Sequence, residues 1–350
     1  MHTSSRPARL LRHCLSGLLI LVSNLICFQN ATCAQITDPR DLGGNVLWLD
    51  GSDVDGDFVT GGTFLNNTTW VDKSTAQIAN ASQTVASSQP TIVTSFNGLT
   101  TVGFDGNDFM DVDSSAFGML RDVASATIIG VLSTELDSSN RSMRALMISS
   151  GANSAATRAG ISFFDSFGTN IGGSGEFGLA GRRLDSDDFE RIEGGDVVAG
   201  ELASMAGVFN YQDGELTLFV NGEEQTSVDS FQTPGNTSDT DSLNIRIGAD
   251  AALNTPRGFF NGQIAELIVY DRALSATELT DVESYIVQKW GPIILGDCNQ
   301  DGVVNFADIP TFISILIAGT FLAEADTNED GMVTFADIPD FIAILILLSQ

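Results

Sequence analysis

Between residues 45 and 272 the hydrophobic positions come in short runs, separated by Gly, Asn, Asp and Ser. Few of these stretches are long enough for a helix, and the pattern is typical of β-strands. The runs that we predict as strands are 45–49, 126–132, 144–149, 159–164, 175–179, 202–209, 243–248 and 263–270. With the further strands expected around turns, the total exceeds ten, which favours a two-sheet antiparallel sandwich over a small barrel.

Two pairs of turn dipeptides support this prediction. Asp213-Gly214 and Asn221-Gly222 lie eight residues apart and enclose a run in which Leu216, Leu218 and Val220 alternate with other residues. Asp-Gly and Asn-Gly supply the positive φ angles of tight hairpin turns, so this region is predicted to be a meander of three strands. The dipeptides at 97–98 and 105–106 repeat the same spacing.

One helix is predicted at the end of this region. Ser275 and Glu278 form a capping box, and Gly291 ends the segment. The helix carries an apolar stripe that consists of Leu279, Val282, Ile286 and Trp290. We expect this stripe to pack on the sandwich.

The N-terminus has the pattern of a secretory signal peptide. Three arginines precede an apolar run at 15–28, and small residues at 32–34 offer a cleavage site. The apolar run is shorter than a membrane span and contains polar residues. We therefore predict a signal peptide at 1–34, a secreted protein, and no membrane span in the mature chain.

Charge and composition narrow the chemistry. The formal net charge is -29, from 45 acidic and 16 basic residues, so nucleic acid is a poor partner and metal cations are good ones. Both histidines lie within the predicted signal peptide, and Cys298 is the one cysteine that follows it. The mature chain would therefore lack a histidine-dependent catalytic triad, histidine-ligated zinc and an internal disulfide.

The C-terminus contains two twelve-residue loops with oxygen donors at positions 1, 3, 5, 7, 9 and 12 and glycine at position 6. The first loop offers Asp297, Asn299, Asp301, the carbonyl of Val303, Asn305 and Asp308. The second offers Asp326, Asn328, Asp330, the carbonyl of Met332, Thr334 and Asp337. This spacing of hard oxygen ligands around a sharp bend is the pattern of a calcium loop, so two Ca²⁺ ions are predicted.

The duplication extends past the ligands. Residues 297–317 and 326–346 are identical at 15 of 21 positions. Each loop is followed by a short apolar segment, predicted as a helix with Pro310 or Pro339 in its first turn. The two helices are expected to pack on each other, since each is too short to span a bilayer. Neither loop is preceded by a convincing entering helix.

The long β region resembles a known family. The segments 46–50, 104–112 and 260–275 are similar to those of laminin-G-like, concanavalin A-like jelly rolls, and the resemblance covers about 42–291. It implies a jelly-roll sandwich. The same fold serves lectins, adhesion modules, glycoside hydrolases and polysaccharide lyases, so it implies no single function.

The duplicated loops with Asp at position 12 resemble the type I dockerin module over residues 296–350. The resemblance implies attachment to a cohesin-like protein on a scaffold or cell surface. The residues at positions 10 and 11 of each loop would then face the partner: Phe306, Ala307, Phe335 and Ala336. The alternative is that the two phenylalanines fill the small core of the module. Cys298, at position 2, is predicted to point away from the ion, with an intermolecular disulfide as a weaker alternative.

Catalytic signals are weak. The nearest match to the Glu-x-Asp-x-x-Glu pattern of laminarinase-like enzymes is 135–140, which ends in Asn. Sugar-stacking aromatics are scarce, because several of the few Trp and Tyr residues look like core residues; stacking by the abundant Phe residues is the alternative. The acidic group Asp50, Asp53, Asp55 and Asp57 is interpreted as a solvated turn rather than as a third calcium site.

The sequence therefore predicts a mainly β protein with three parts: the signal peptide, a jelly roll at 42–291, and a small all-α calcium-binding, dockerin-like domain at 296–350. The predicted function is non-catalytic recognition of an extracellular polysaccharide or a protein, tethered through the dockerin-like domain. One alternative is a polysaccharide-degrading enzyme, either a glycoside hydrolase or a lyase. Another is a structural surface protein whose calcium loops serve only stability.

Overall fold

The computed structural model describes residues 36–66, 68–96, 98–135, 142–151, 157–165, 175–188, 190–229, 234–250, 256–299 and 302–348. The predicted signal peptide lies outside these residues, as do Gln300 and Asp301 of the first loop.

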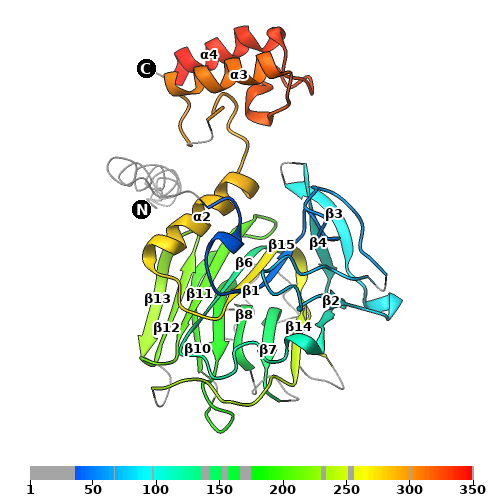
Figure 1. Cartoon of the computed structure of the whole chain (residues 1–350), viewed down its shortest axis with the longest axis vertical. Helices are drawn as coiled ribbons and strands as arrows, with labels where there is room; N and C mark the ends of the chain where they lie inside the picture. Colours follow the sequence, from blue (N-terminus) through cyan, green and yellow to red (C-terminus); the bar gives the residue numbers. More distant parts are fainter. Residues whose placement is uncertain are drawn as a thin grey trace, which may run out of the picture. The chain divides into compact units, whose positions relative to one another are not determined.

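The β region folds into two antiparallel sheets (Figure 1). The eight-stranded sheet has the order β13 (Glu223–Asp229), β12 (Glu215–Val220), β11 (Ala203–Asn210), β6 (Ala126–Thr134), β15 (Asn261–Tyr270), β4 (Leu99–Asp105) and β3 (Thr91–Phe96), with β1 (Asn45–Asp50) also paired to β15. The seven-stranded sheet has the order β10 (Glu190–Val197), β9 (Gly175–Gly181), β8 (Thr157–Asp165), β7 (Ser142–Ser149), β14 (Asn244–Ile247), β5 (Met110–Val112) and β2 (Ala81–Ser82).

The predicted meander is confirmed. Strands β11, β12 and β13 are neighbours in the eight-stranded sheet, and Asn221 and Gly222 join the last two with φ angles of 49° and 76°. Two successive positive φ angles give a turn whose twist matches that of the flanking strands. The local turn chemistry therefore sets the register here.

Two hydrophobic cores lie on opposite faces of the eight-stranded sheet. The larger core is shared by both sheets, and along β15 it takes Ile264, Leu267 and Val269. The smaller core takes Ile268 and Tyr270 from the other face of the same strand. Side chains of a strand alternate between faces, so one strand supplies both cores.

Helix α2 (Ala276–Trp290) contributes Val282, Ile286 and Trp290 to the smaller core, and Figure 1 shows the helix running along the eight-stranded sheet. The predicted capping box is present: Ser275 accepts a hydrogen bond from the backbone N–H of Glu278, whose carboxylate accepts one from the N–H of Ser275. Val282, Ile286 and Trp290 are buried as predicted.

Glu266 of β15 is fully buried beneath α2. A register irregularity between Ile264 and Glu266 marks a bulge in the pairing with β6, and bulges re-aim side chains. The Glu266 carboxylate accepts hydrogen bonds from Tyr285 Oη at 2.8 Å and Trp290 Nε1 at 3.0 Å, and it forms an ion pair with Lys289. These contacts hold the helix to the sheet.

Residues 51–80 connect β1 to β2, and those of them that the structure describes form no helix or strand. The connection contains isolated β-bridges, such as that between Asp53 and Gly61. The backbone N–H of Trp70 donates to the carbonyl of Ala81 at 2.8 Å. Connections of this length without secondary structure are uncommon in compact domains and are usually functional.

The C-terminal segment contains α3 (Ile309–Ala318) and α4 (Ile338–Leu348), each preceded by a short 3-10 turn, η6 (Phe306–Asp308) or η8 (Phe335–Asp337). A third 3-10 turn, η7 (Ala323–Ala325), precedes the second loop. Pro310 and Pro339 stand in the first turns of the helices, as predicted. Across the described residues, no helix has both the length and the apolarity that crossing a membrane requires.

Candidate metal centres and the sandwich surface

The two C-terminal loops have the same backbone shape. The glycine at position 6 has a φ angle of 84° in the first loop, at Gly302, and 85° in the second, at Gly331. This left-handed conformation costs glycine little and makes the sharp bend that the sequence predicts. After the bend, each loop continues through its 3-10 turn into the helix that follows it.

The first and last carboxylates close each loop through matching hydrogen bonds. Asp297 accepts from the N–H of Gly302 at 2.8 Å, and Asp326 accepts from the N–H of Gly331 at 2.8 Å. At the other end, the position-12 carboxylate accepts from the backbone N–H groups of positions 3 and 9. Asp308 accepts from the N–H of Asn299 at 3.0 Å and of Asn305 at 2.8 Å. Asp337 accepts from the N–H of Asn328 at 3.2 Å and of Thr334 at 2.7 Å.

These four carboxylates are buried. Asp308 and Asp337 are fully buried, and Asp297 and Asp326 are nearly so. Buried carboxylates require a compensating charge or strong hydrogen bonds. No lysine or arginine occurs between residues 290 and 350, which contain nine acidic residues. A hard cation therefore fits the chemistry of this donor set.

The remaining predicted ligands include residues at positions 3, 5 and 7 of the loops. Asn328 and Asp330 lie on the second loop and contact each other, with Asn328 Nδ2 donating to Asp330 Oδ2 at 3.2 Å. Asn299, Val303 and Met332 lie at their predicted loop positions, whereas Asp301 falls outside the described residues. Among the described residues, the three-carboxylate group with oxygens mutually within 4.8 Å is elsewhere, at Asp53, Asp55 and Asp57.

Position 9 has a role that the sequence reasoning missed. Asn305 Oδ1 accepts from the N–H of Ala307 at 2.8 Å, and Thr334 Oγ1 accepts from the N–H of Ala336 at 3.1 Å. Both side chains therefore cap the 3-10 turns that lead into the helices. The signal was present in the sequence, because Asn and Thr three residues before Asp form a capping pattern.

The two helices share a small core, as predicted. Phe312 and Phe341 stack with ring centroids 3.9 Å apart and planes 13° from parallel. Cys298 is buried in the same core, so the disulfide alternative is wrong for this conformation. Burial raises the pKa of its thiol to about 12.

The phenylalanines at position 10 of the loops do not fill this core. Phe306 is 68% exposed and Phe335 is 77% exposed, and the alanines that follow them, Ala307 and Ala336, are exposed as well. The alternative interpretation, in which these rings are core residues, is therefore wrong. The four residues present a surface that a partner can reach.

The acidic turn after β1 differs from the prediction. Asp50 and Asp53 are buried, and Lys73 Nζ lies 2.8 Å from Asp50 Oδ2 and 2.7 Å from Asp53 Oδ2. Lys289 Nζ also lies 2.8 Å from Asp50 Oδ2. Asp57 is exposed, so only the far end of this group is a solvated turn.

The six Trp and Tyr residues of the chain are all buried: Trp48, Trp70, Trp290, Tyr211, Tyr270 and Tyr285. The prediction that several belong to the core is confirmed and extends to all of them. In the described part of the sandwich, Phe58 is the exposed aromatic residue.

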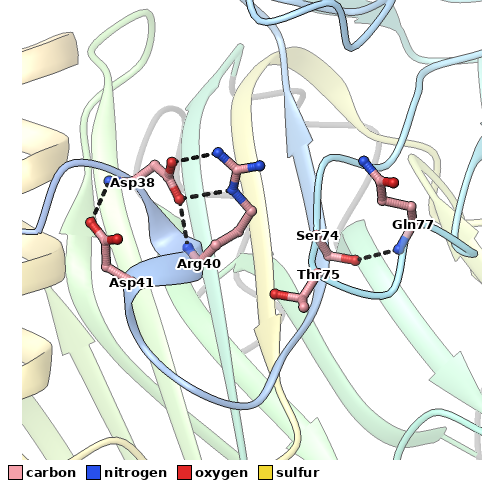
Figure 2. A pocket seen from close by; sticks show the side chains of 6 residues that line it. All are labelled: Asp38, Arg40, Asp41, Ser74, Thr75 and Gln77. Atoms are coloured by element: carbon pink, nitrogen blue, oxygen red, sulfur yellow. Dashed lines mark hydrogen bonds and ion pairs between the residues drawn. The ribbon is translucent and has the colours of Figure 1, made fainter.

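A shallow, open depression of about 440 Å³ lies on the sandwich beside the 51–80 connection (Figure 2). Its walls come from η1 (Pro39–Asp41) with the preceding Asp38, and from the turn at 74–77. In Figure 2 the residues of the first wall bond to one another, Ser74 and Gln77 of the second wall bond to each other, and no dashed line joins the two walls. The lining residues are Asp38, Arg40, Asp41, Ser74, Thr75 and Gln77.

Comparison with known proteins supports the jelly roll. Residues 134–280 match a family model described as the concanavalin A-like lectin/glucanases superfamily. The match and the two antiparallel sheets together confirm the mainly β sandwich. No curated protein matches the chain in sequence.

Several solved structures are similar to part of the chain. The carbohydrate-binding module CBM40 of a Ruminococcus gnavus sialidase is 20% identical with a TM-score of 0.43, covering 52% of this chain and 96% of its own. A pentraxin from Limulus polyphemus is 15% identical with a TM-score of 0.37, covering 47% and 71%. Domain 4 of the extracellular arabinanase AbnA from Geobacillus stearothermophilus, solved with arabinotriose, is 15% identical with a TM-score of 0.42, covering 68% and 98%.

Proposed function

We propose that this chain is a secreted, non-catalytic recognition protein in which the sandwich binds carbohydrate and the C-terminal module binds two Ca²⁺ ions. The observation that carries the proposal is the repeated closure of two loops around buried carboxylates in a segment without lysine or arginine. A segment that buries carboxylates twice in the same way, and that has no lysine or arginine, is stabilised by bound cations.

The ligands of the first ion would be Asp297, Asn299, Asp301, the Val303 carbonyl, Asn305 and Asp308, and those of the second would be their counterparts in the second loop. Bound calcium would supply charge neutralisation and cross-link the start and end of each loop. Metal binding is then coupled to folding of a module whose own core is small.

Calorimetric titration of the full chain with Ca²⁺ tests the metal sites. We expect two bound ions at neutral pH, and a gain of helical circular dichroism when Ca²⁺ replaces a chelator. Mg²⁺ should be a weak substitute, because it demands a smaller octahedral site. An unchanged helical spectrum in chelator, together with no heat of Ca²⁺ binding, would overturn the proposal.

We further propose that the C-terminal module docks a cohesin-like protein through Phe306, Ala307, Phe335 and Ala336. Two large exposed rings at equivalent places in a duplicated unit are unusual on a surface that meets only water. Surface plasmon resonance against a purified cohesin-like protein, in calcium and in chelator, tests this. The Phe306→Ser, Phe335→Ser double variant should lose binding while keeping its two ions.

Carbohydrate recognition rests on the family match of the sandwich. A panel of polysaccharides tests binding, and a reducing-sugar assay on the same panel separates a binder from an enzyme. Binding without product supports the proposal. Release of reducing ends by the wild-type chain would replace it with the hydrolase alternative.

A further inference from the structure

The depression beside η1 adjoins an exposed aromatic ring in a constrained backbone. Phe58 is 50% exposed and has a φ angle of 66°. A bulky side chain rarely adopts this left-handed conformation, and it persists only where the surroundings enforce it. Such positions cluster at ligand-binding sites.

The surroundings of Phe58 do enforce it. The backbone N–H of Phe58 donates to Asp53 Oδ2 at 2.9 Å, and that of Asp57 donates to Asp53 Oδ1 at 3.1 Å. Asp53 itself is buried against Lys73. The ring of Phe58 is therefore presented to solvent by a rigid, buried anchor.

Arg40 joins the ring to the depression. Its guanidinium carbon lies 4.5 Å from the centroid of the Phe58 ring, and Arg40 also lines the depression. The guanidinium is fixed by Asp38, which accepts from Nη2 at 2.6 Å and from Nε at 3.0 Å. The aromatic ring and the polar wall are therefore held together as one surface.

The opposite wall is constrained as well. Gln77 has a φ angle of 51°, and its backbone N–H donates to Ser74 Oγ at 3.3 Å. Figure 2 shows Gln77, Ser74 and Thr75 on this turn. Ser74 Oγ is buried and donates to Asp72, so the groups that this turn exposes are the Gln77 amide and the Thr75 hydroxyl. Both groups donate and accept hydrogen bonds.

The charges of this surface select the ligand class. Asp38 and Asp41 contribute two negative charges against the one positive charge of Arg40, and Asp57 is exposed beside Phe58. A carboxylate or sulfate on a ligand would be repelled here. Uncharged hydroxyl groups would find both donors and acceptors.

From this arrangement we infer that the depression, with Phe58 at its edge, is the subsite where the sandwich binds a neutral oligosaccharide. The apolar face of a sugar ring packs on Phe58, and its hydroxyl groups bond to Asp41, Thr75 and Gln77. The inference rests on the proposed carbohydrate recognition and adds its place and its ligand class.

Affinity electrophoresis of the full chain tests the subsite, with neutral polysaccharides (glucan, xylan, mannan, arabinan and galactan) and acidic ones (polygalacturonate and a sulfated galactan) in the gel. We expect retardation by at least one neutral polysaccharide. Phe58→Ala should weaken that binding at least tenfold. Phe58→Trp should retain it, because the larger ring keeps the stacking face.

Two further variants keep the test sharp. Gln77→Gly removes the amide but suits the positive φ angle, so it should weaken binding without unfolding the turn. Phe321→Ala removes another exposed phenylalanine, from the C-terminal segment, and should bind like wild type. Thermal midpoints of all variants confirm that the sandwich is intact.

The outcomes separate the two proposals. Neutral-glycan binding that survives both Phe58→Ala and Gln77→Gly overturns the subsite and leaves carbohydrate recognition standing. Binding of acidic polysaccharides alone overturns the ligand class. A wild-type chain that binds no polysaccharide overturns both the subsite and the proposed recognition.

Discussion

At the scale of single residues, the chain is notable for where it places its basic side chains. Its only two lysines, Lys73 and Lys289, both form ion pairs with buried acids of the sandwich; Lys73 is buried and Lys289 is partly buried. Asp50 and Glu266 face each other across β1 and β15, and Lys289 bridges them. Like charges opposite each other would otherwise destabilise the pairing.

The protonation of this group follows from its surroundings. Burial alone would raise the pKa of Asp50, but the charges of Lys289 and Lys73 outweigh it and hold that pKa below its ordinary value. Burial raises the pKa of Glu266, against the opposing effect of Lys289. The two acids therefore compete for one ammonium group, and Asp50 holds its charge more firmly.

Replacing Glu266 by alanine should destabilise the sandwich by about 3 to 5 kcal/mol, because Lys289 and the Trp290 indole lose a buried partner. Glu266→Gln should cost less, since the amide oxygen still accepts hydrogen bonds. Urea denaturation measures both. Glu215→Ala, an exposed change in the same sheet, serves as the control. Equal stabilities for wild type and Glu266→Ala would contradict this account of the helix contact.

In the C-terminal module, Asp330→Ala should abolish tight binding at the second loop while the first loop keeps its ion. Asp330 supplies a proposed ligand, and its Oδ1 also accepts from the N–H of Met332 at 3.0 Å. Calorimetric titration should show one remaining tight site. Asp340→Ala, on α4 outside the loop, should still bind two ions. Two ions of wild-type affinity in Asp330→Ala would show that this carboxylate is not a ligand.

At the scale of elements, the sequence was most informative where a local rule decides the structure. The hairpin at 221–222 and the cap at Ser275 were predictable because their determinants lie within a few residues. The pairing of β1 with β15 was not predictable, since its partners are separated by more than 200 residues. The conformation of Phe58 was missed for the same reason, because a buried Asp53–Lys73 pair enforces it.

The repeated shape of the two C-terminal loops was predictable for a related reason, whereas their binding of calcium stays a prediction. Their ligands lie on twelve consecutive residues, and the second copy confirms the spacing of the first. The depression beside η1 joins two segments more than thirty residues apart, Asp38 and the turn at Gln77. No periodicity links these segments, so only the fold brings them together.

The N-terminal cap of α2 should give a pH-dependent contribution to stability. The Glu278 carboxylate accepts two hydrogen bonds from Arg272, and these lower the pKa of Glu278 to about 2. The folded pKa lies below the unfolded value of about 4.3, so the stabilisation is complete above that value and is lost as the pH falls toward 2. Glu278→Gln should therefore cost about 1 kcal/mol at pH 7 and less at pH 3.

Thermal unfolding of the wild type and Glu278→Gln at a series of pH values measures this difference. Thr280→Ala, in the same helix but bonded to the Ala276 carbonyl rather than to Ser275 or Glu278, is the comparison variant. A cost of Glu278→Gln that grows as the pH falls would reverse the sign of the proposed linkage.

At the scale of the whole molecule, the chain is built on separate hydrophobic cores. Two belong to the sandwich and one to the C-terminal loops and helices. The C-terminal core contains only a few buried side chains, so it gives limited stability by itself. The sandwich has a large core, to which the C-terminal segment contributes no residue among those that the structure describes.

Chelation of calcium should therefore unfold one part and spare the other. Differential scanning calorimetry of the full chain in a chelator should retain the sandwich transition within about 2 °C, while the transition of the C-terminal module disappears. Added Ca²⁺ should restore it and raise its midpoint with concentration, as expected for a ligand that binds only the folded state. A sandwich transition that falls with chelation would instead place a structural ion in the sandwich.

The distribution of rare side chains also makes each part observable by itself. Every Trp and Tyr lies between residues 48 and 290, all of them buried, whereas the described C-terminal segment has a buried thiol at Cys298. Intrinsic fluorescence therefore follows only the sandwich. A maleimide reagent follows only the C-terminal segment, because Cys298 becomes reactive when its core opens. In a chain from which residues 1–34 and their three cysteines have been removed, the two signals would report the two folding equilibria separately.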